Sequence, residues 1–253
     1  MAKIIAFANQ KGGVGKTTTA VNLAAGLFKN KKKTLLIDFD PQANATSATG
    51  IDLEKIENDS YDFLINNNID VNKAIIRRDD DFDIIPSTTQ LAGAEVELSN
   101  QSGRQFYLKK SLSDINAEYD FILIDNPPAL GLLSLNALTA ADSVLIPVQA
   151  EFFALEGLAQ LIKTINLVKK HSNSYLTIEG ILMTMTTHTK ISRQVVSEIE
   201  GHFPKAAYKF TIPRSVRLAE APSFGQSIFE FAGLSSGARA YNKLVKEIIK
   251  SDG

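Results

Sequence analysis

A loop rich in glycine and lysine constrains the fold of this chain more than any other feature. Residues 9–19 read Asn-Gln-Lys-Gly-Gly-Val-Gly-Lys-Thr-Thr-Thr, between an apolar run at residues 3–8 and a helical pattern at residues 16–29. The run predicts a buried strand, and the pattern predicts a helix because its apolar side chains recur at helical spacing. The chain therefore passes here from a strand into the start of a helix, as chains of the α/β class do.

This loop has the chemistry of a phosphate-binding site. At a helix N-terminus, the backbone N–H groups and the helix dipole both favour an anion. Lys16 can reach the outer phosphates of a nucleotide, and the hydroxyl of Thr17 can hold Mg²⁺. A lone glycine cluster can also be a flexible loop without a ligand, but the flanking strand and helix and the Lys-Thr ending favour a nucleoside triphosphate.

The loop departs from the usual phosphate-loop pattern at its start. That pattern asks for glycine five residues before the Gly-Lys pair, where this chain has Gln10 followed by Lys11. In this form, residues 11–19 resemble the deviant Walker A motif of the ParA/MinD superfamily of ATPases. Residues 35–44 resemble the second motif of that superfamily, and residues 121–128 resemble its Walker B strand.

Three further segments are similar to the ParA/Soj branch, whose members partition chromosomes and plasmids: residues 137–142, 153–158 and 212–223. The similarity runs nearly from end to end and is weakest at residues 52–105. It implies an α/β P-loop NTPase fold, a mostly parallel twisted sheet with helices on both faces. It also implies an ATPase of weak basal activity that uses ATP and Mg²⁺.

The hydrophobic pattern agrees with such a sheet, because apolar runs alternate with helical stretches. The runs that predict buried strands are residues 34–37, 82–85, 121–124, 143–148, 178–183 and 208–212. The stretches that predict further helices are residues 155–168, 192–202 and 235–250. The polar stretch at residues 66–81 is interpreted as a surface connection, and residues 1–253 are expected to form a single ParA-type ATPase domain because no linker-like stretch divides them.

Composition excludes several other classes of protein. The chain has no cysteine, so disulfides, thiolate metal sites and iron–sulfur clusters are excluded. No signal peptide is recognised at the N-terminus, and no apolar run approaches the roughly 18 residues of a membrane span. His171, His188 and His202 show no metal-ligand spacing. We expect a cytoplasmic, nucleoid-associated protein without a membrane partner.

Phosphoryl transfer also needs a bound metal ion and an oriented water, and carboxylates at strand ends can supply both. Asp125 follows four apolar strand residues, as a Walker B aspartate does, and would hold the metal through water. Asp38 and Asp40 are two apart, so their side chains point to the same side of the strand end. The resemblance assigns Asp40 to the attacking water and places Asp38 nearer the metal and the loop.

The resemblance also implies a set of site residues. Nucleotide binding falls to Lys11, Gly12, Gly13, Val14, Gly15, Lys16, Thr17, Thr18, Pro213 and Arg214. The resemblance assigns catalysis to Lys11, Lys16 and Asp40, and it assigns metal binding to Thr17, Asp40 and Asp125. In relatives, the lysine matching Lys11 reaches the ATP of a second subunit, which implies a homodimer that closes with ATP. Gly12 and Gly13 would permit the close approach of two loops.

Charge is unevenly distributed along the chain. Residues 1–150 carry 14 basic and 19 acidic side chains, whereas residues 151–253 carry 13 and 9. On charge alone an ordinary solvated surface is the preferred interpretation, but the resemblance favours a surface for non-specific DNA. The residues that it indicates are Arg217, Lys190, Arg193 and His188. The stimulating partner would be a ParB-like centromere-binding protein.

Two positions depart from the Soj-like pattern and bear on DNA binding. Thr186 stands where relatives have aspartate, and His188 stands where they have an arginine used for DNA. Unlike arginine, the histidine at this position is mostly neutral at pH 7. We therefore expect DNA binding that is weaker, more dependent on pH, or compensated by Lys190 and Arg193.

Two other functions stay open at this point. A MinD-like membrane-associated positioning ATPase needs a basic amphipathic anchor at the C-terminus, and residues 243–253 offer a short helix end and a polar tail. A regulator that binds ATP without hydrolysing it is the other alternative, and the presence of Asp40 disfavours it.

Overall fold

The computed structural model describes residues 1–65, 71–78 and 80–252. Within them, six strands form one sheet: β1 (Lys3–Phe7), β2 (Thr34–Asp38), β3 (Asp83–Ile85), β4 (Phe121–Asp125), β5 (Ser143–Gln149) and β6 (Thr177–Thr184). Their order is β3-β2-β4-β1-β5-β6, and each neighbouring pair is parallel. This confirms the predicted α/β fold with a parallel sheet.

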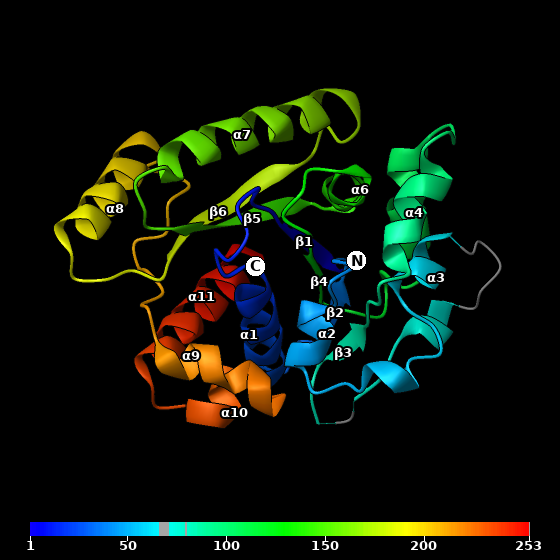
Figure 1. Cartoon of the computed structure of the whole chain (residues 1–253), viewed down its shortest axis with the longest axis horizontal. Coiled ribbons are helices and arrows are strands. Elements are labelled where there is room, and N and C mark those ends of the chain that lie inside the picture. The colour runs from blue at the N-terminus through cyan, green and yellow to red at the C-terminus, as the bar shows by residue number, and fades with distance from the viewer. Residues whose placement is uncertain (66–70, 79, 253) are drawn as a thin grey trace.

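Helices cover both faces of this sheet, with α7 on one side and α1 and α11 on the other (Figure 1). The α-helices are α1 (Lys16–Lys29), α2 (Asn44–Ala48), α3 (Ser60–Ile65), α4 (Leu91–Leu98), α5 (Tyr107–Leu112), α6 (Leu132–Ala140), α7 (Ala154–His171), α8 (Lys190–His202), α9 (Val216–Glu220), α10 (Ile228–Ala232) and α11 (Ser236–Asp252). Short 3₁₀ turns lie at Leu53–Lys55, Val71–Ala74, Arg104–Phe106 and Ala221–Phe224. Among the described residues, no helix combines the length and the apolar character needed to cross a bilayer.

The core is split in two by the sheet. Along β4, Ile122 and Ile124 belong to the cluster that includes Leu161 of α7, whereas Phe121 and Leu123 belong to the cluster that α1 and α11 cover. Successive side chains of a strand point to opposite faces, so a strand buried on both faces must be apolar throughout. This explains why the predicted strands read as continuous apolar runs.

The prediction of a buried strand at residues 208–212 is wrong. This segment runs beside the edge strand β6 and bonds to it only at its two ends, where Tyr208 N–H donates to Ile181 O (3.1 Å) and Ile212 N–H donates to Met183 O (2.9 Å). Between these bonds the Phe210 ring packs against the Tyr208 ring, with centroids 5.3 Å apart. The apolar pattern therefore came from ring packing beside the sheet and not from a seventh buried strand.

The interpretation of residues 66–81 as a surface connection holds only in part. Residues 66–70 and 79 lie outside the described residues. Ala74 and Ile75 are buried, and Ile76 forms an antiparallel bridge with Ile84 of β3. This part of the stretch therefore contributes to the core at the edge of the sheet.

Candidate active site

The phosphate loop lies at the carboxyl end of β1, and α1 begins directly after it. Gly13 and Gly15 have φ angles of 73° and 84°, in the left-handed region that a β-carbon disfavours. Gly12 lies outside that region, and a β-carbon on it would meet no described atom within 4 Å. The backbone path thus accounts for glycine at positions 13 and 15, whereas position 12 leaves open space in front of the loop.

Lys16 is the buried cation of the site. It is only 7% exposed and lies close to the carboxylates of Asp125 and Asp40. Burial lowers the pKa of Lys16, and the charges of Asp125 and Asp40 oppose this effect. The first residue of α1 therefore sits in one electrostatic cluster with the two carboxylates, at the helix end that favours anions.

Two neighbouring strands bring the carboxylates together, because β2 and β4 pair with Asp38 opposite Asp125. The Asp38 carboxylate accepts bonds from the N–H and the hydroxyl of Thr46, at 2.7 Å each, and from the N–H of Asp40 at 3.2 Å. Burial raises the pKa of Asp38 to about 6, although the bonds from Thr46 oppose this. One oxygen of Asp38 thus holds the turn that carries Asp40, and the other holds Thr46, a contact that sequence reasoning missed.

Asp125 is the carboxylate best placed for a cation. It is fully buried, and neither of its carboxylate oxygens makes a hydrogen bond of ordinary geometry to a described residue. Burial raises the pKa of Asp125 to about 8, the charge of Asp38 adds to this, and the nearby Thr17 and Lys16 side chains oppose it. No cluster of three or more His, Cys, Asp or Glu side chains in the described part of the chain could hold a metal. Mg²⁺ is commonly held by one or two carboxylates together with phosphates, and Asp125 beside Thr17 fits that mode.

Without nucleotide and metal, the protein is expected to lose stability as the pH rises from 6 to 8. Asp125 has a pKa of about 8 when folded and an ordinary value of 3.8, so the folded state binds about one more proton than the unfolded state at pH 6 and about half a proton more at pH 8. The free energy of unfolding then falls with rising pH, by up to about 3 kcal/mol, which corresponds to about 5 °C in Tm. Thermal melts in a chelator measure this. Asp125→Asn cannot ionise and should lose most of this pH dependence, keeping the smaller part that Asp38 contributes. A wild-type Tm that does not fall between pH 6 and pH 8 would rule out Asp125 as the group responsible.

Lys11 pairs with a residue outside its own loop. Its ammonium group pairs with the carboxylate of Glu151, and the side-chain amide of Gln149 donates to the other oxygen of Glu151. The side chains of Lys11 and Glu151 are 55% and 48% exposed. Sequence reasoning missed this pair, although Glu151 follows β5 at the same edge of the sheet as the loop.

Pro213 and Arg214, which the resemblance assigns to nucleotide binding, lie beside the phosphate loop. They line a pocket of about 440 Å³ together with Gly15 and Thr18 at the start of α1. Met185, which follows β6 with a φ of 50°, lines the same pocket. The structure therefore brings these residues together in a cavity that adjoins the helix N-terminus.

The four residues predicted to contact DNA fall in two places. Arg217 lies on α9 and pairs with Glu220 at 3.1 Å. His188 and Lys190 lie at the start of α8, and Arg193 lies within its first turns. His188 and Arg193 line one pocket, which Arg217 does not line. A common DNA surface would therefore have to extend over both α8 and α9.

Comparison with known proteins matches the chain over nearly its whole length. Residues 2–178 match a family described as AAA domain. The chain is 51% identical to the sporulation initiation inhibitor protein Soj of Bacillus subtilis over 251 residues, which cover 98% of each chain. It is 48% identical to the chromosome partitioning protein ParA of Myxococcus xanthus over 254 residues, covering 100% of this chain and 89% of the relative. A solved structure of cobyrinic acid a,c-diamide synthase from Mycobacterium smegmatis, with bound ADP and magnesium, has a TM-score of 0.87 and 33% identity over 99% of this chain and 95% of that one.

Proposed function

Because the chain belongs to the Soj/ParA family of chromosome-partitioning ATPases, we propose that it uses ATP and Mg²⁺ to switch between a free form and a dimer that binds DNA. The observation that carries this proposal is the cluster of Lys16, Asp40 and Asp125 at the phosphate loop. Hydrolysis, slow on its own and stimulated by a ParB-like partner, returns the protein to the free form.

The residues of the loop have separable tasks in this proposal. The backbone N–H groups of the loop and Lys16 hold the phosphates, and Thr17, Asp40 and Asp125 are the residues that would hold Mg²⁺. When bound, Mg²⁺ neutralises phosphate charge. The bond from the Asp40 N–H to Asp38 fixes the turn that carries Asp40. From this position, the Asp40 carboxylate would orient the attacking water. Most of the catalysis is positioning and charge, as is usual for phosphoryl transfer.

Dimer closure is supported by what surrounds the loop. Lys11 is paired with Glu151 outside the loop, and a β-carbon on Gly12 would meet no described atom within 4 Å. Phe152 and Phe153, next to Glu151, are 79% and 71% exposed. Exposed aromatic side chains beside a charged cluster are typical of a surface that a second molecule covers. In the closed dimer, Lys11 would reach the ATP of the other subunit.

Glu151→Gln is expected to lower the ATP concentration needed for half-maximal dimer formation by about twofold to fivefold. Lys11 must leave Glu151 before it can reach across, and an exposed ion pair is worth up to about 1 kcal/mol. Light scattering across an ATP titration measures the midpoint. Glu156→Gln changes the same charge at an exposed neighbouring position and should leave the midpoint unchanged. A midpoint that stays the same or rises in Glu151→Gln would show that this pair does not restrain Lys11.

The function itself is tested by capture of the protein on immobilised duplex DNA. We expect capture with ATP and much less with ADP or without nucleotide, because closure places two copies of the basic surface side by side. If the dimer neutralises about four phosphates, a fourfold rise in salt should weaken binding by roughly a hundredfold, with little dependence on base sequence. Equal capture under all three nucleotide conditions would contradict the switch.

Arg217→Glu is expected to weaken ATP-dependent DNA binding by at least about tenfold and to leave ATP hydrolysis unchanged. The substitution reverses a charge on the proposed DNA surface, and α9 contributes no residue of the phosphate loop. Electrophoretic mobility shifts with ATP measure the change. Lys250→Glu makes the same charge reversal near the far end of α11 and should bind like the wild type. Binding of Arg217→Glu equal to that of the wild type would remove α9 from the DNA surface.

A further inference from the structure

Two consecutive carbonyl groups of the phosphate loop accept hydrogen bonds from buried hydroxyl groups. The Thr184 hydroxyl, at the end of β6, donates to the Val14 oxygen at 2.8 Å. The Thr19 hydroxyl, in the first turn of α1, donates to the Gly15 oxygen at 2.6 Å, and the Thr19 N–H donates to the same oxygen at 2.9 Å. None of the tasks given to the loop above involves these two hydroxyls.

A bond to a carbonyl also fixes the N–H of the same peptide group, because the group is planar and its C=O and N–H point in opposite directions. The Val14 oxygen shares a peptide with the Gly15 N–H, and the Gly15 oxygen shares one with the Lys16 N–H. Neither of these N–H groups donates a hydrogen bond to a described residue. Free N–H groups at a helix N-terminus are the ones that bind phosphate. The two hydroxyls therefore set the direction of two donors that the nucleotide site needs.

The peptide between Gly15 and Lys16 depends on such a restraint more than most. Gly15 caps the start of α1 with a φ of 84°, and no side chain caps this end of the helix. Glycine can adopt many backbone conformations, so its own torsions hold the peptide plane only weakly. The two bonds from Thr19 to the Gly15 oxygen use both lone pairs of that oxygen and hold the plane from outside.

The Thr19 hydroxyl is itself bonded to Tyr241 of α11, the helix that packs along α1 (Figure 1). The two hydroxyl oxygens are 3.2 Å apart, and both residues are buried. A hydroxyl has one proton, and Thr19 uses its proton toward the Gly15 oxygen, so the Tyr241 hydroxyl is the donor to Thr19. Burial raises the pKa of Tyr241 well above its usual range, which keeps this proton in place at neutral pH.

We propose that Thr19 and Tyr241 are positioning residues of the nucleotide site. Tyr241 holds the Thr19 hydroxyl, Thr19 holds the Gly15 carbonyl, and the Lys16 N–H is thereby aimed at phosphate before a nucleotide arrives. The inference rests on the proposed nucleotide site at the phosphate loop. It adds that a helix more than 200 residues further along the chain, α11, takes part in binding without touching the ligand.

The test measures the affinity of the full chain for ADP with Mg²⁺ by calorimetric titration. Thr19→Val removes the hydroxyl and keeps the branched shape, and it should weaken binding by about threefold to tenfold, the usual effect of one lost buried hydrogen bond. Thr19→Ser restores the hydroxyl and should bind ADP like the wild type. Unchanged affinity in Thr19→Val would overturn the proposal.

A double-mutant cycle distinguishes action through Thr19 from direct contact with the ligand. Tyr241 also lines the cavity beside the loop, so its hydroxyl could bind the nucleotide itself. Tyr241→Phe should weaken ADP binding by about threefold in the wild-type chain and leave the affinity of Thr19→Val unchanged, because no hydroxyl remains there to be held. The same loss in both backgrounds would overturn the proposal.

The matched control removes another buried tyrosine hydroxyl. Tyr119 donates to Asp83 at 2.8 Å, and Asp83 begins β3, at the end of the sheet opposite the loop. Tyr119→Phe should lower Tm and leave ADP affinity unchanged, which separates loss of stability from loss of positioning. Thermal melts establish that each variant is folded at the titration temperature, and Thr19→Ala replaces Thr19→Val in the cycle if the double variant does not fold.

Failure of this inference is distinguishable from failure of the proposed site. A wild-type chain that did not bind ADP with Mg²⁺ would refute the site at the phosphate loop, and the positioning role with it. A wild-type chain that binds ADP and a Thr19→Val variant of equal affinity would keep the site and refute the positioning role alone.

Discussion

Lys16→Ala is expected to reduce ATP hydrolysis by at least about a hundredfold and to weaken nucleotide binding. Lys16 contributes a positive charge at the start of α1 and is almost entirely buried. A hydrogen-bond donor that is fixed in such a low-dielectric position stabilises the transition state far more than a donor at the surface does. Removing a single such donor from a preorganised site costs on the order of a hundredfold to a thousandfold in turnover. Release of inorganic phosphate and titration with ADP measure the two effects.

The control for this variant lies at the other end of the same helix. Lys29→Ala removes an exposed lysine from the last turn of α1, where no phosphate can be reached, and should hydrolyse ATP like the wild type. Thermal melts of both variants confirm that they are folded. Hydrolysis by folded Lys16→Ala at the wild-type rate would refute the assignment of residues 9–19 as the phosphate loop.

Two substitutions are expected to separate turnover from dimer formation completely. Asp40→Ala should lose hydrolysis by about a hundredfold or more and still form the dimer with ATP, because Asp40 orients water and Lys16 and the loop hold the phosphates. Gly12→Val should bind ATP and remain a monomer. A β-carbon at Gly12 meets no described atom within 4 Å, so the chain itself leaves room at this position, and the added bulk should obstruct a second loop that approaches it.

Size exclusion with light scattering in ATP distinguishes the two variants. Gly201→Val is the matched control for the glycine, because Gly201 also has open space around its β-carbon position but lies on α8, away from the loop. It should dimerise like the wild type. The same oligomeric state for Asp40→Ala and Gly12→Val would contradict the face-to-face dimer.

The sequence predicted the parts of the fold that depend on local pattern. The helix at residues 16–29 matches α1 at both ends, since the loop marks its start and the apolar spacing its length. The runs at residues 34–37 and 121–124 match β2 and β4 within one residue, because strands buried on both faces read as unbroken apolar runs. Residues 208–212 misled the prediction because an edge segment packed by its own rings has the same composition.

Contacts between distant residues were not predictable in the same way. The bonds from Thr46 to Asp38 depend on how the turn after β2 folds back, and nothing in the local sequence marks Thr46 as a donor. The pairing of Lys11 with Glu151 requires β1 and β5 to be neighbours in the sheet. Tyr241 reads as an ordinary core residue of an amphipathic helix until α11 is placed against α1.

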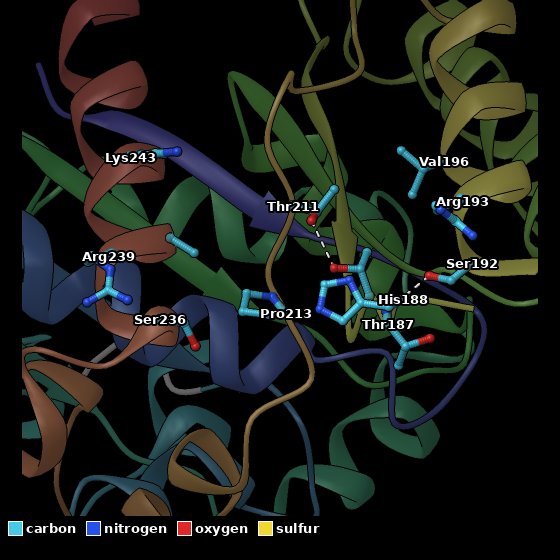
Figure 2. Close-up of a pocket in the computed structure, with 12 residues that line it drawn as sticks. Thr187, His188, Ser192, Arg193, Val196, Thr211, Pro213, Ser236, Arg239 and Lys243 are labelled. Carbon is cyan, nitrogen blue, oxygen red and sulfur yellow. Dashed lines mark hydrogen bonds between the residues drawn. The ribbon is translucent and has the colours of Figure 1, made fainter. Parts of the chain in front are cut away.

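The segment at residues 211–214 separates two pockets. Pro213 lines both the cavity beside the phosphate loop and a second pocket, of about 550 Å³, between α8 and α11 (Figure 2). The bond from the Arg214 N–H to Thr186 O (3.0 Å) ties the segment to the residues that follow β6. A ligand in one pocket that moved this segment would also change the free energy of binding in the other pocket. Thermodynamic linkage then requires the two effects to be equal: the factor by which a ligand in one pocket changes the affinity of the other pocket is the factor by which its own affinity changes in return.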